Sequence, residues 1–262
     1  MGATTTFIRY NRKYWNLLWE LLSSQFKVKD QSTVLGYFWS FLHPLIMLGV
    51  LFLVFHNAMG RNIPHYAMYL LIGLVHYAHF SNSTSASLHA LLSMRNLTTD
   101  TIFPKELLVI GTALATSIDF VVSVGICLLI AFLSGLQPGW GLLMLPAIIV
   151  LQVTLVLWVA LFLSCLFVFV RDIDHLYQLF LRLLFFVTPI FYAPSFLMEG
   201  KGKYVVLLNP LTHLITFART ILIEGSSIPG RLFLALLFVN LCLLCVGFVV
   251  FRKYEPAFAE RI

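Results

Sequence analysis

The stretch "STVLGYFWSFLHPLIMLGVLFLVF", which runs from Ser32 to Phe55, opens with a cluster of aromatic residues and ends in an unbroken apolar run. It contains no Asp, Glu, Lys or Arg, and it is long enough for a bilayer-spanning helix, which needs about 20 mostly apolar residues. His43 and Pro44 separate its two parts, and Pro44 cannot donate a backbone hydrogen bond. The stretch therefore predicts a membrane-spanning helix that is loosened near one end.

The rest of the chain has the same apolar character. Of its 262 residues, 60% are hydrophobic and only 11% are charged, and the mean hydropathy is +0.92. These values lie far from those of soluble domains. The apolar runs are continuous and do not alternate, which predicts helices instead of a barrel. We therefore expect an all-α integral membrane protein with six spanning helices, at 36–56, 66–90, 106–134, 142–170, 175–193 and 231–251.

These six stretches leave no room for a separate soluble domain. Residues 1–262 are therefore expected to form a single membrane domain. It would comprise an N-terminal segment at 1–31, a six-span bundle at 36–251 and a short tail at 252–262.

Residues 7–26 have polar side chains on one side of a helix and apolar side chains on the other. Trp15 and Trp19 suit the depth of lipid headgroups. The pattern predicts an amphipathic helix lying on the membrane surface. Glu20 disfavours the alternative, a transit peptide, because transit peptides are poor in acidic residues.

The distribution of basic residues predicts the orientation. With the N-terminus inside, eleven of the 17 Lys and Arg residues fall in cytoplasmic segments, five in external segments, and Arg182 within a span. Cytoplasmic loops carry the basic excess in membrane proteins. Both termini and the 91–108 loop are therefore expected in the cytoplasm. Basic side chains that face an anionic leaflet also account for the net charge of +6 without nucleic acid.

The 91–108 loop, "LLSMRNLTTDTIFPKELL", combines charged residues with an apolar step. Arg95, Lys105 and Glu106 are charged, whereas Phe103 and Pro104 would expose apolar surface. Two interpretations stay open. The segment is either an ordinary solvated loop or a loop with a short helix that docks on another protein.

Motifs for nucleotide binding and catalysis are absent from the sequence. There is no Gly-x-x-x-x-Gly-Lys-Ser/Thr loop to hold a nucleotide, and no Gly-x-Ser-x-Gly or His-Glu-x-x-His pattern. His76 and His79 share a helical face, but a zinc site needs three or four ligands. We interpret them as polar groups near a membrane surface or in a helix contact. We expect no enzymatic activity, metal or cofactor in this chain, so energy for transport has to come from a partner or an ion gradient.

Two charged residues lie inside predicted spans, Asp119 in the third and Arg182 in the fifth. Such residues are costly in a bilayer and usually functional. Counted from the cytoplasmic ends of their helices, their depths differ by only about 9 Å. A structural ion pair and a role in a transport pathway both stay open.

The segment before the last span is apolar, but its pieces are too short to cross a membrane. "YVVLL" and "LTHLITFARTILI" are separated by Asn209 and Pro210. Non-helical backbone at membrane depth is tolerated only when protein buries it or when it lines a cavity. The pattern predicts a pair of re-entrant helices in the outer leaflet.

Taken in order, these motifs resemble a known family. "STVLGYFWSFLHPLIM", "FPKELL", "RDI", "TPIFY" and "NPLTHLITFARTIL" follow one another as in the membrane subunits of ABC exporters for polysaccharides and polyol phosphates. That family exports O-antigen, capsule and teichoic acid chains. The resemblance covers nearly the whole chain. It departs at "HYAHF", where the family more often has a Pro-Trp-aromatic step, and this leaves the lining of the second span and the choice of substrate open.

The resemblance implies a homodimer of six-span permease subunits in the bacterial inner membrane, above two separate ATP-binding subunits that would hold ATP and Mg²⁺. A lipid-linked glycan would move outward through a channel between the two copies. Asn209 and Pro210 would join the outer gate helices. The residues implied in contact with the ATPase are Arg95, Phe103, Pro104, Lys105 and Glu106.

Aromatic side chains are expected to line such a channel, because sugar rings have apolar faces and aromatic rings offer rigid contact area. Tyr37 and Phe41 share one side of the first span and would border the cytoplasmic entrance. Phe185 and Tyr192 would continue the path outward. An aromatic belt at the membrane surface is the alternative.

Three other functions were weighed. An exporter of a lipid or drug would share the six-span plan. A membrane-embedded acyltransferase or glycosyltransferase would need a convergent acid/base set, which the sequence lacks. A scaffold without transport is the third, and a neighbouring gene for an ATPase would argue against it.

Overall fold

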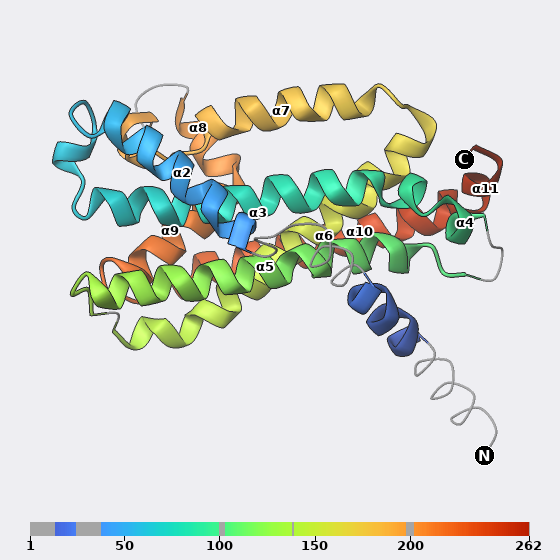
Figure 1. The fold of residues 1–262 in the computed structure, drawn as a ribbon, viewed down its shortest axis with the longest axis horizontal. Coiled ribbons are helices and arrows are strands. Elements are labelled where there is room, and N and C mark those ends of the chain that lie inside the picture. The colour runs from blue at the N-terminus through green and yellow to red at the C-terminus, as the bar shows by residue number, and fades with distance from the viewer. Residues whose placement is uncertain (1–13, 25–37, 100–102, 138, 198–201, 262) are drawn as a thin grey trace, which may run out of the picture.

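A computed structural model describes residues 14–24, 38–99, 103–137, 139–197 and 202–261, and every regular element in these ranges is a helix (Figure 1). A first helix covers 14–24. The long helices are α2 (Phe38–Phe55), α3 (Tyr66–Ser93), α5 (Glu106–Leu133), α6 (Leu145–Phe169), α7 (Ile173–Val187) and α10 (Gly230–Tyr254). The short ones are η1 (Gly60–Asn62), α4 (Arg95–Thr98), η2 (Trp140–Met144), η3 (Pro194–Leu197), α8 (Gly202–Leu208), α9 (Pro210–Leu222), η4 (Glu255–Ala257) and α11 (Phe258–Arg261).

The expectation of an all-α membrane protein is confirmed, and a long helix occupies each of the six predicted stretches. Among the described residues, three helices are clearly long and apolar enough to cross a membrane: Glu106–Leu133, Trp140–Phe169 and Gly230–Ala257. The pair α8 and α9 would count as a fourth if it forms one span, although the two helices are bent by 75°. The number of spans stays a prediction.

The fifth predicted span is shorter than expected. α7 ends at Val187 and has 15 residues, which gives a length of about 22 Å against a hydrocarbon core of about 30 Å. Thr188 adopts an extended conformation with a ψ of 130°, because a residue before proline, here Pro189, disfavours the helical region. The helix therefore stops six residues before the predicted end at 193.

α3 lies at the centre of the bundle and contacts α2, α5, α6, α7 and α9. α10 packs on α6 at the periphery. Successive long helices run in alternating directions (Figure 1). As a result, the helix over 14–24, α4 and α11 lie at one end of the molecule, here called the α4 end. η1, η2 and α9 lie at the opposite end, called the α9 end.

The helix over 14–24 rests one apolar side on the bundle. Leu18 is buried, and both Leu18 and Leu21 lie beside Gly111 of α5. Trp15 and Trp19 point away from the bundle and are 67% and 70% exposed. Its position at a membrane surface stays a prediction.

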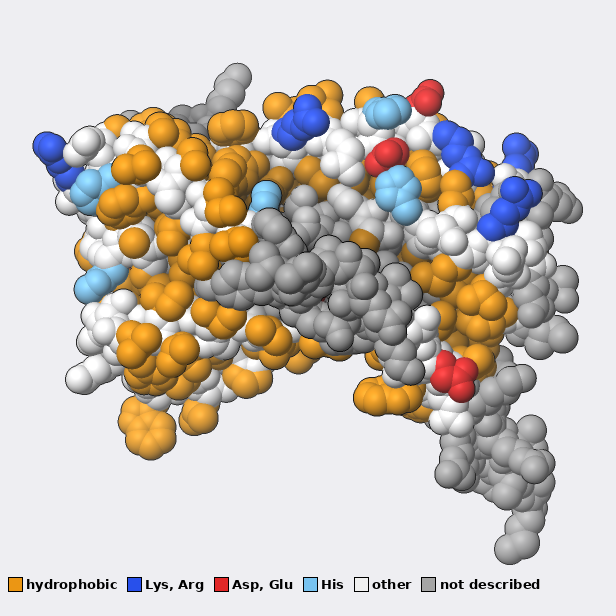
Figure 2. All heavy atoms as spheres, viewed as in Figure 1, with side chains coloured by type: hydrophobic (Ala, Val, Ile, Leu, Met, Phe, Trp, Pro, Cys, Tyr) orange, Lys and Arg blue, Asp and Glu red, His pale blue; other side chains and the backbone are white. Residues whose placement is uncertain are grey.

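The charge distribution gives a test of the topology. On the face drawn in Figure 2, most of the visible basic side chains gather toward the α4 end. We expect a membrane-impermeant maleimide, applied to intact cells, to label Ser226→Cys at the α9 end. Asn96→Cys and Lys253→Cys at the α4 end should react only after the cells are permeabilised. The exposed native thiols, Cys242 and Cys245, are replaced by alanine as background. Labelling of position 96 in intact cells would reverse the orientation.

Candidate functional site

Polar side chains run along the whole of α3 and face its neighbours. His76 Nδ1 lies 2.6 Å from Gln152 Oε1 of α6, and Gln152 Nε2 donates to the His76 carbonyl. His79 Nε2 lies 3.1 Å from Ser117 Oγ of α5, and its ring stacks on Phe120. Both histidines are buried, so the helix-contact interpretation is confirmed for them. The described residues hold no cluster of His, Cys, Asp and Glu that would suit a metal ion.

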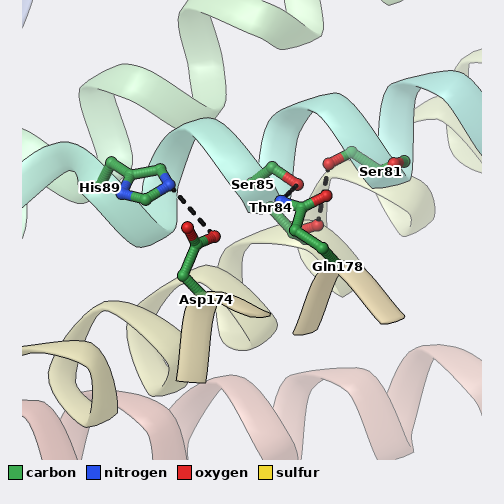
Figure 3. Close-up of polar contacts among 6 residues, drawn as sticks. All are labelled: Ser81, Thr84, Ser85, His89, Asp174 and Gln178. Atoms are coloured by element: carbon green, nitrogen blue, oxygen red, sulfur yellow. Dashed lines mark hydrogen bonds and ion pairs between the residues drawn. The ribbon is translucent and has the colours of Figure 1, made fainter. Parts of the chain in front are cut away.

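Polar contacts also attach α7 to α3 (Figure 3). His89 Nε2 lies 3.4 Å from Asp174 Oδ1, and one turn further along, Gln178 Nε2 donates to Ser85 Oγ at 3.4 Å. His89 and Ser85 are four positions apart on α3, and their partners are four positions apart on α7. This spacing keeps both contacts on the facing sides of two antiparallel helices. We call this row of contacts the α3–α7 seam.

Two tyrosines strengthen the seam. Tyr177 donates to Thr84 Oγ1, and Tyr77 donates to the Leu181 carbonyl, each at 2.5 Å. The opposite face of α7 is apolar and exposed, at Leu176, Leu179, Phe180, Leu183 and Phe186. α7 is therefore held to the bundle by polar contacts on one side, and its other side is free to meet lipid or a second copy.

Beyond the seam, α2, α3 and α7 enclose a groove of about 310 Å³. Tyr77 and Phe185 form part of its wall and meet edge to face, with ring centroids 5.1 Å apart. The lining residues are His43, Pro44, Met47, Leu74, Tyr77, Ala78, Ser81, Asn82, Arg182, Phe185 and Phe186. Phe185, a predicted channel residue, therefore lines this groove together with Tyr77, and its role in a channel stays a prediction.

A smaller cavity of about 110 Å³ lies between α2, α3 and α5. Asp119 lines this cavity together with His79 and Thr116, whereas Arg182 lines the groove. In the described part of the chain, ion pairs join His89 with Asp174 and Glu106 with Arg252. Asp119 and Arg182 thus line different cavities.

At the α9 end, Arg219 joins three segments of the chain. Its guanidinium donates to the carbonyls of Tyr69, Pro189 and Ile190 at 2.8 to 3.1 Å. The guanidinium carbon also lies 3.3 Å from the centroid of the Tyr69 ring. Because Arg219 is only 4% exposed, these contacts replace water around the charge. They fix α9 to α3 and to the turn after α7.

That turn is also fixed by tyrosines. Tyr66 and Tyr69 donate to the carbonyls of Phe191 and Tyr192. Tyr192 donates to the carbonyls of Phe186 and Val187, which end α7, and its side chain is 5% exposed. This corrects the expectation that Tyr192 lines the path: its ring is buried and closes the last turn of α7.

Asn209 and Pro210 form the junction between α8 and α9, as the sequence predicts for this pair. Asn209 Oδ1 accepts from the Leu211 amide as the N-cap of α9, and Pro210 occupies the first helical position. Asn209 Nδ2 donates to Thr188 Oγ1 at 2.9 Å. The junction is therefore attached to the end of α7.

At the α4 end, Lys105 and Glu106 of the Phe-Pro-Lys-Glu motif contact other parts of the same chain. Lys105 and Glu106 are buried. Lys105 contacts Glu255 through its backbone amide and its ammonium group, and Glu106 pairs with Arg252 at 3.4 Å. These contacts hold the C-terminal segment beside the start of α5.

Phe103 is partly buried against an apolar cluster that includes Phe251 and Phe258. This corrects the expectation that Phe103 would expose its apolar surface, because part of its ring is covered within the chain. Pro104 is also partly buried, whereas Arg95 of α4 is exposed. Among the described residues of α4, Arg95 and Asn96 are exposed, whereas Thr98 is buried.

Two predicted site residues cannot be placed by their side chains. Tyr37 lies outside the described residues. Phe41 belongs to the first turn of α2, but the described part of the chain does not include its side chain.

Comparison with known proteins identifies the family. Residues 16–223 match the family described as ABC-2 type transporter, which is more than half of the chain. The chain belongs to the ABC-2 transporter membrane family. It is 28% identical over 256 residues to the "O-antigen export system permease protein RfbA" of Myxococcus xanthus, covering 97% of this chain and 98% of that protein. A protein of the same name from Klebsiella pneumoniae is also 28% identical, with the same coverage.

These matches confirm the family that the sequence motifs indicate. They identify a membrane transport permease of the ABC-2 type, not an enzyme, and this family implies a partner that binds ATP.

Sequence reasoning missed two parts of this ABC-2 permease. Arg219 was counted as a basic residue of an external segment, although it is a buried clamp. The run "SNSTSAS" at 81–87 lies inside a predicted span, and this polar composition could have indicated that α3 packs among other helices over much of its surface.

The Arg219 clamp predicts coupled effects of two substitutions. Arg219→Ala should lower the free energy of unfolding by about 3 kcal/mol, because three buried carbonyls lose a charged donor. Gly73→Ala should also destabilise the protein, since a Cβ at Gly73 would lie 2.7 Å from Arg219 Nη2. The double variant should lose less than the sum of the two. Thermal unfolding in detergent measures this, with the exposed Arg231→Ala as control. Additive losses would contradict the clamp.

Proposed function

We propose that this chain is the permease subunit of an ATP-driven exporter in the bacterial inner membrane. Its cargo is a lipid-linked polysaccharide or polyol phosphate polymer of the O-antigen, capsule or teichoic acid class. Two copies of the chain form the channel, and two ATP-binding subunits, which hold ATP and Mg²⁺, attach on the cytoplasmic side. Family membership and the names of the relatives support this proposal.

The observation that carries the proposal is the groove beside α7. α7 contacts the bundle through the α3–α7 seam, and the groove of about 310 Å³ continues along the same side between α2 and α3. Its wall combines aromatic rings with polar groups, which suits a chain of sugar rings with apolar faces and hydroxyl rims. A second copy that packs against α2 and the exposed face of α7 would close this groove into a conduit.

We assign the parts of the conduit as follows. Tyr37 and Phe41 border its cytoplasmic entrance, at the start of α2, and Phe185 with Tyr77 forms the wall beyond. Tyr192 supports this wall from inside the protein, because its hydroxyl holds the carbonyls at the end of α7.

The outer gate is formed by α8 and α9, which bend by 75° at Asn209 and Pro210. α9 is fixed by Arg219. α8 leaves Leu207 and Leu208 exposed, so a movement of α8 would break fewer contacts with the bundle than a movement of α9. We therefore propose that α8 is the moving part of the gate and that Asn209 is its pivot.

The loop at the α4 end transmits movement from the ATPase. α4 presents Arg95 to the partner, and the loop continues through Phe103 and Pro104 to α5. Lys105 and Glu106 connect the same point to the C-terminal segment. Movement of α4 would therefore reach α5 and α10 together.

An exporter of a lipid or drug is the second candidate, since the exposed apolar face of α7 would also suit a lipid chain. A transferase has less support, because His76 is bonded to Gln152 and the cavity that His79 lines offers a single acid, Asp119.

The coupling role of α4 predicts a charge-sensitive contact. Arg95→Glu should abolish the stimulation of ATP hydrolysis by cargo, while the abundance and unfolding temperature of the permease stay unchanged, because the side chain is exposed. The measurement is ATPase activity of the reconstituted complex. Lys253→Glu, an exposed basic residue at the same end, should leave coupling intact. Normal coupling in the Arg95 variant would remove α4 from the ATPase interface.

The conduit predicts separate effects on export and abundance. A Tyr37→Ala, Phe41→Ala, Phe185→Ala triple variant should reach the membrane at native abundance and export polymer at least tenfold more slowly, because the cargo loses its aromatic contacts. Surface polymer is quantified in cells that carry the partner ATPase. Phe238→Ala, on the exposed face of α10, is the matched control. Native export by the triple variant would contradict the conduit, and reduced abundance alone would indicate an aromatic belt.

A further inference from the structure

Arg182 is an exposed charged residue two thirds of the way along α7, and the helices around it supply almost no acid. It is the tenth residue of α7, about 14 Å along the helix from its start. α2 and α3, the other two walls of the groove, contain no Asp or Glu. A charge at such depth is costly unless it meets a partner or a water-filled path.

The single acid of α7 is already engaged. Asp174 lies eight residues before Arg182, about 12 Å away along the helix axis, and it contacts His89 across the seam (Figure 3). Asp119 lines the other cavity. Among the described residues, no carboxylate lies within ion-pair distance of Arg182.

The surroundings of Arg182 resemble an anion site more than a lipid-facing surface. Arg182 and His43 both line the groove, and Ser81 and Asn82 add polar side chains that can donate hydrogen bonds. Phe185 and Phe186 add apolar surface beside Arg182, which is itself exposed and therefore accessible to a ligand. The groove volume of about 310 Å³ lies at the lower end of the range for ligand sites.

The wall beside Arg182 is held in place by its own contacts. Tyr77 donates to the Leu181 carbonyl, one residue before Arg182, and its ring meets Phe185 edge to face. The site is therefore positioned before a ligand arrives, which reduces the entropy lost on binding.

We propose that Arg182 binds a phosphoryl group of the cargo as it passes through the groove. A planar guanidinium matches phosphate oxygens with two parallel hydrogen bonds. The group is the diphosphate of a lipid carrier or a phosphodiester of the polymer. A single cation binds such a group strongly enough to admit it and weakly enough to release it. This inference rests on the proposed export function and names the charged part of its substrate.

Binding is measured on the purified full-length chain in phosphatidylcholine nanodiscs, without the ATPase. The probes are farnesyl diphosphate for the lipid carrier, a glycerol phosphate oligomer for the polymer, and farnesol as the uncharged reference. Arg182→Gln should raise the dissociation constant of farnesyl diphosphate roughly tenfold, the value of one charge-assisted contact. Arg231→Gln, at the exposed start of α10, should leave this dissociation constant unchanged. Farnesol should bind the native chain and both variants with equal affinity.

A second measurement uses the native chain and needs no variant. Farnesyl diphosphate should slow the modification of Arg182 by phenylglyoxal, followed by mass spectrometry, whereas farnesol should not. If only the glycerol phosphate oligomer depends on Arg182, the site stands and its ligand is the polymer. Unchanged affinity of both phosphoryl probes in Arg182→Gln, an equal loss in Arg231→Gln, or no protection of Arg182 by either probe would overturn the site.

Export by cells separates this inference from the proposed function. If the native chain exports polymer and Arg182→Gln exports it equally well at native abundance, the phosphoryl site fails and the function stands. If the native chain exports no polymer but still binds the diphosphate through Arg182, the function fails and the site stands.

Discussion

The polar side chains of α3 have to be satisfied inside a membrane, and the arrangement of the bundle depends on this constraint. A helix that carries three histidines and the run "SNSTSAS" would be expensive in lipid. Each neighbouring helix removes part of that cost with a specific partner: α6 through Gln152, α5 through Ser117, and α7 through Asp174 and Gln178. α3 therefore determines which helix lies on which side, and this places the groove.

The same helix connects the two ends of the molecule. At the α9 end, the Tyr69 carbonyl of α3 accepts from Arg219, which fixes α9 and the turn after α7. Toward the α4 end, α3 continues into α4, the segment that faces the proposed ATPase. α7 lies between these points and joins the bundle through the polar seam and through apolar contacts that include Leu181 and Leu184.

The fold class and the helix junction at Asn209 and Pro210 could be predicted from the sequence, because they depend on local properties. Continuous apolar runs indicate helices at the right places, and Asn209 with Pro210 marks a helix junction through N-cap and proline chemistry. Other features depend on contacts between distant residues. Tyr192 looked like a channel aromatic but bonds to the end of its own helix, and Phe103 looked uncovered but packs on the C-terminal segment. A one-dimensional pattern does not show which partner a ring will meet.

The sequence by itself determined that this chain is a helical membrane protein and a member of an ABC exporter family. Its hydropathy indicates that the chain lies in a bilayer, and the order of its motifs indicates the family. Only the tertiary structure decided what its charges do. Arg219 and Arg182 both follow apolar residues and look alike in sequence. One is surrounded by three carbonyls and serves the fold, while the other faces a groove whose walls offer it no carboxylate. The difference lies in which helices pack beside each residue, and that packing is a property of the whole bundle.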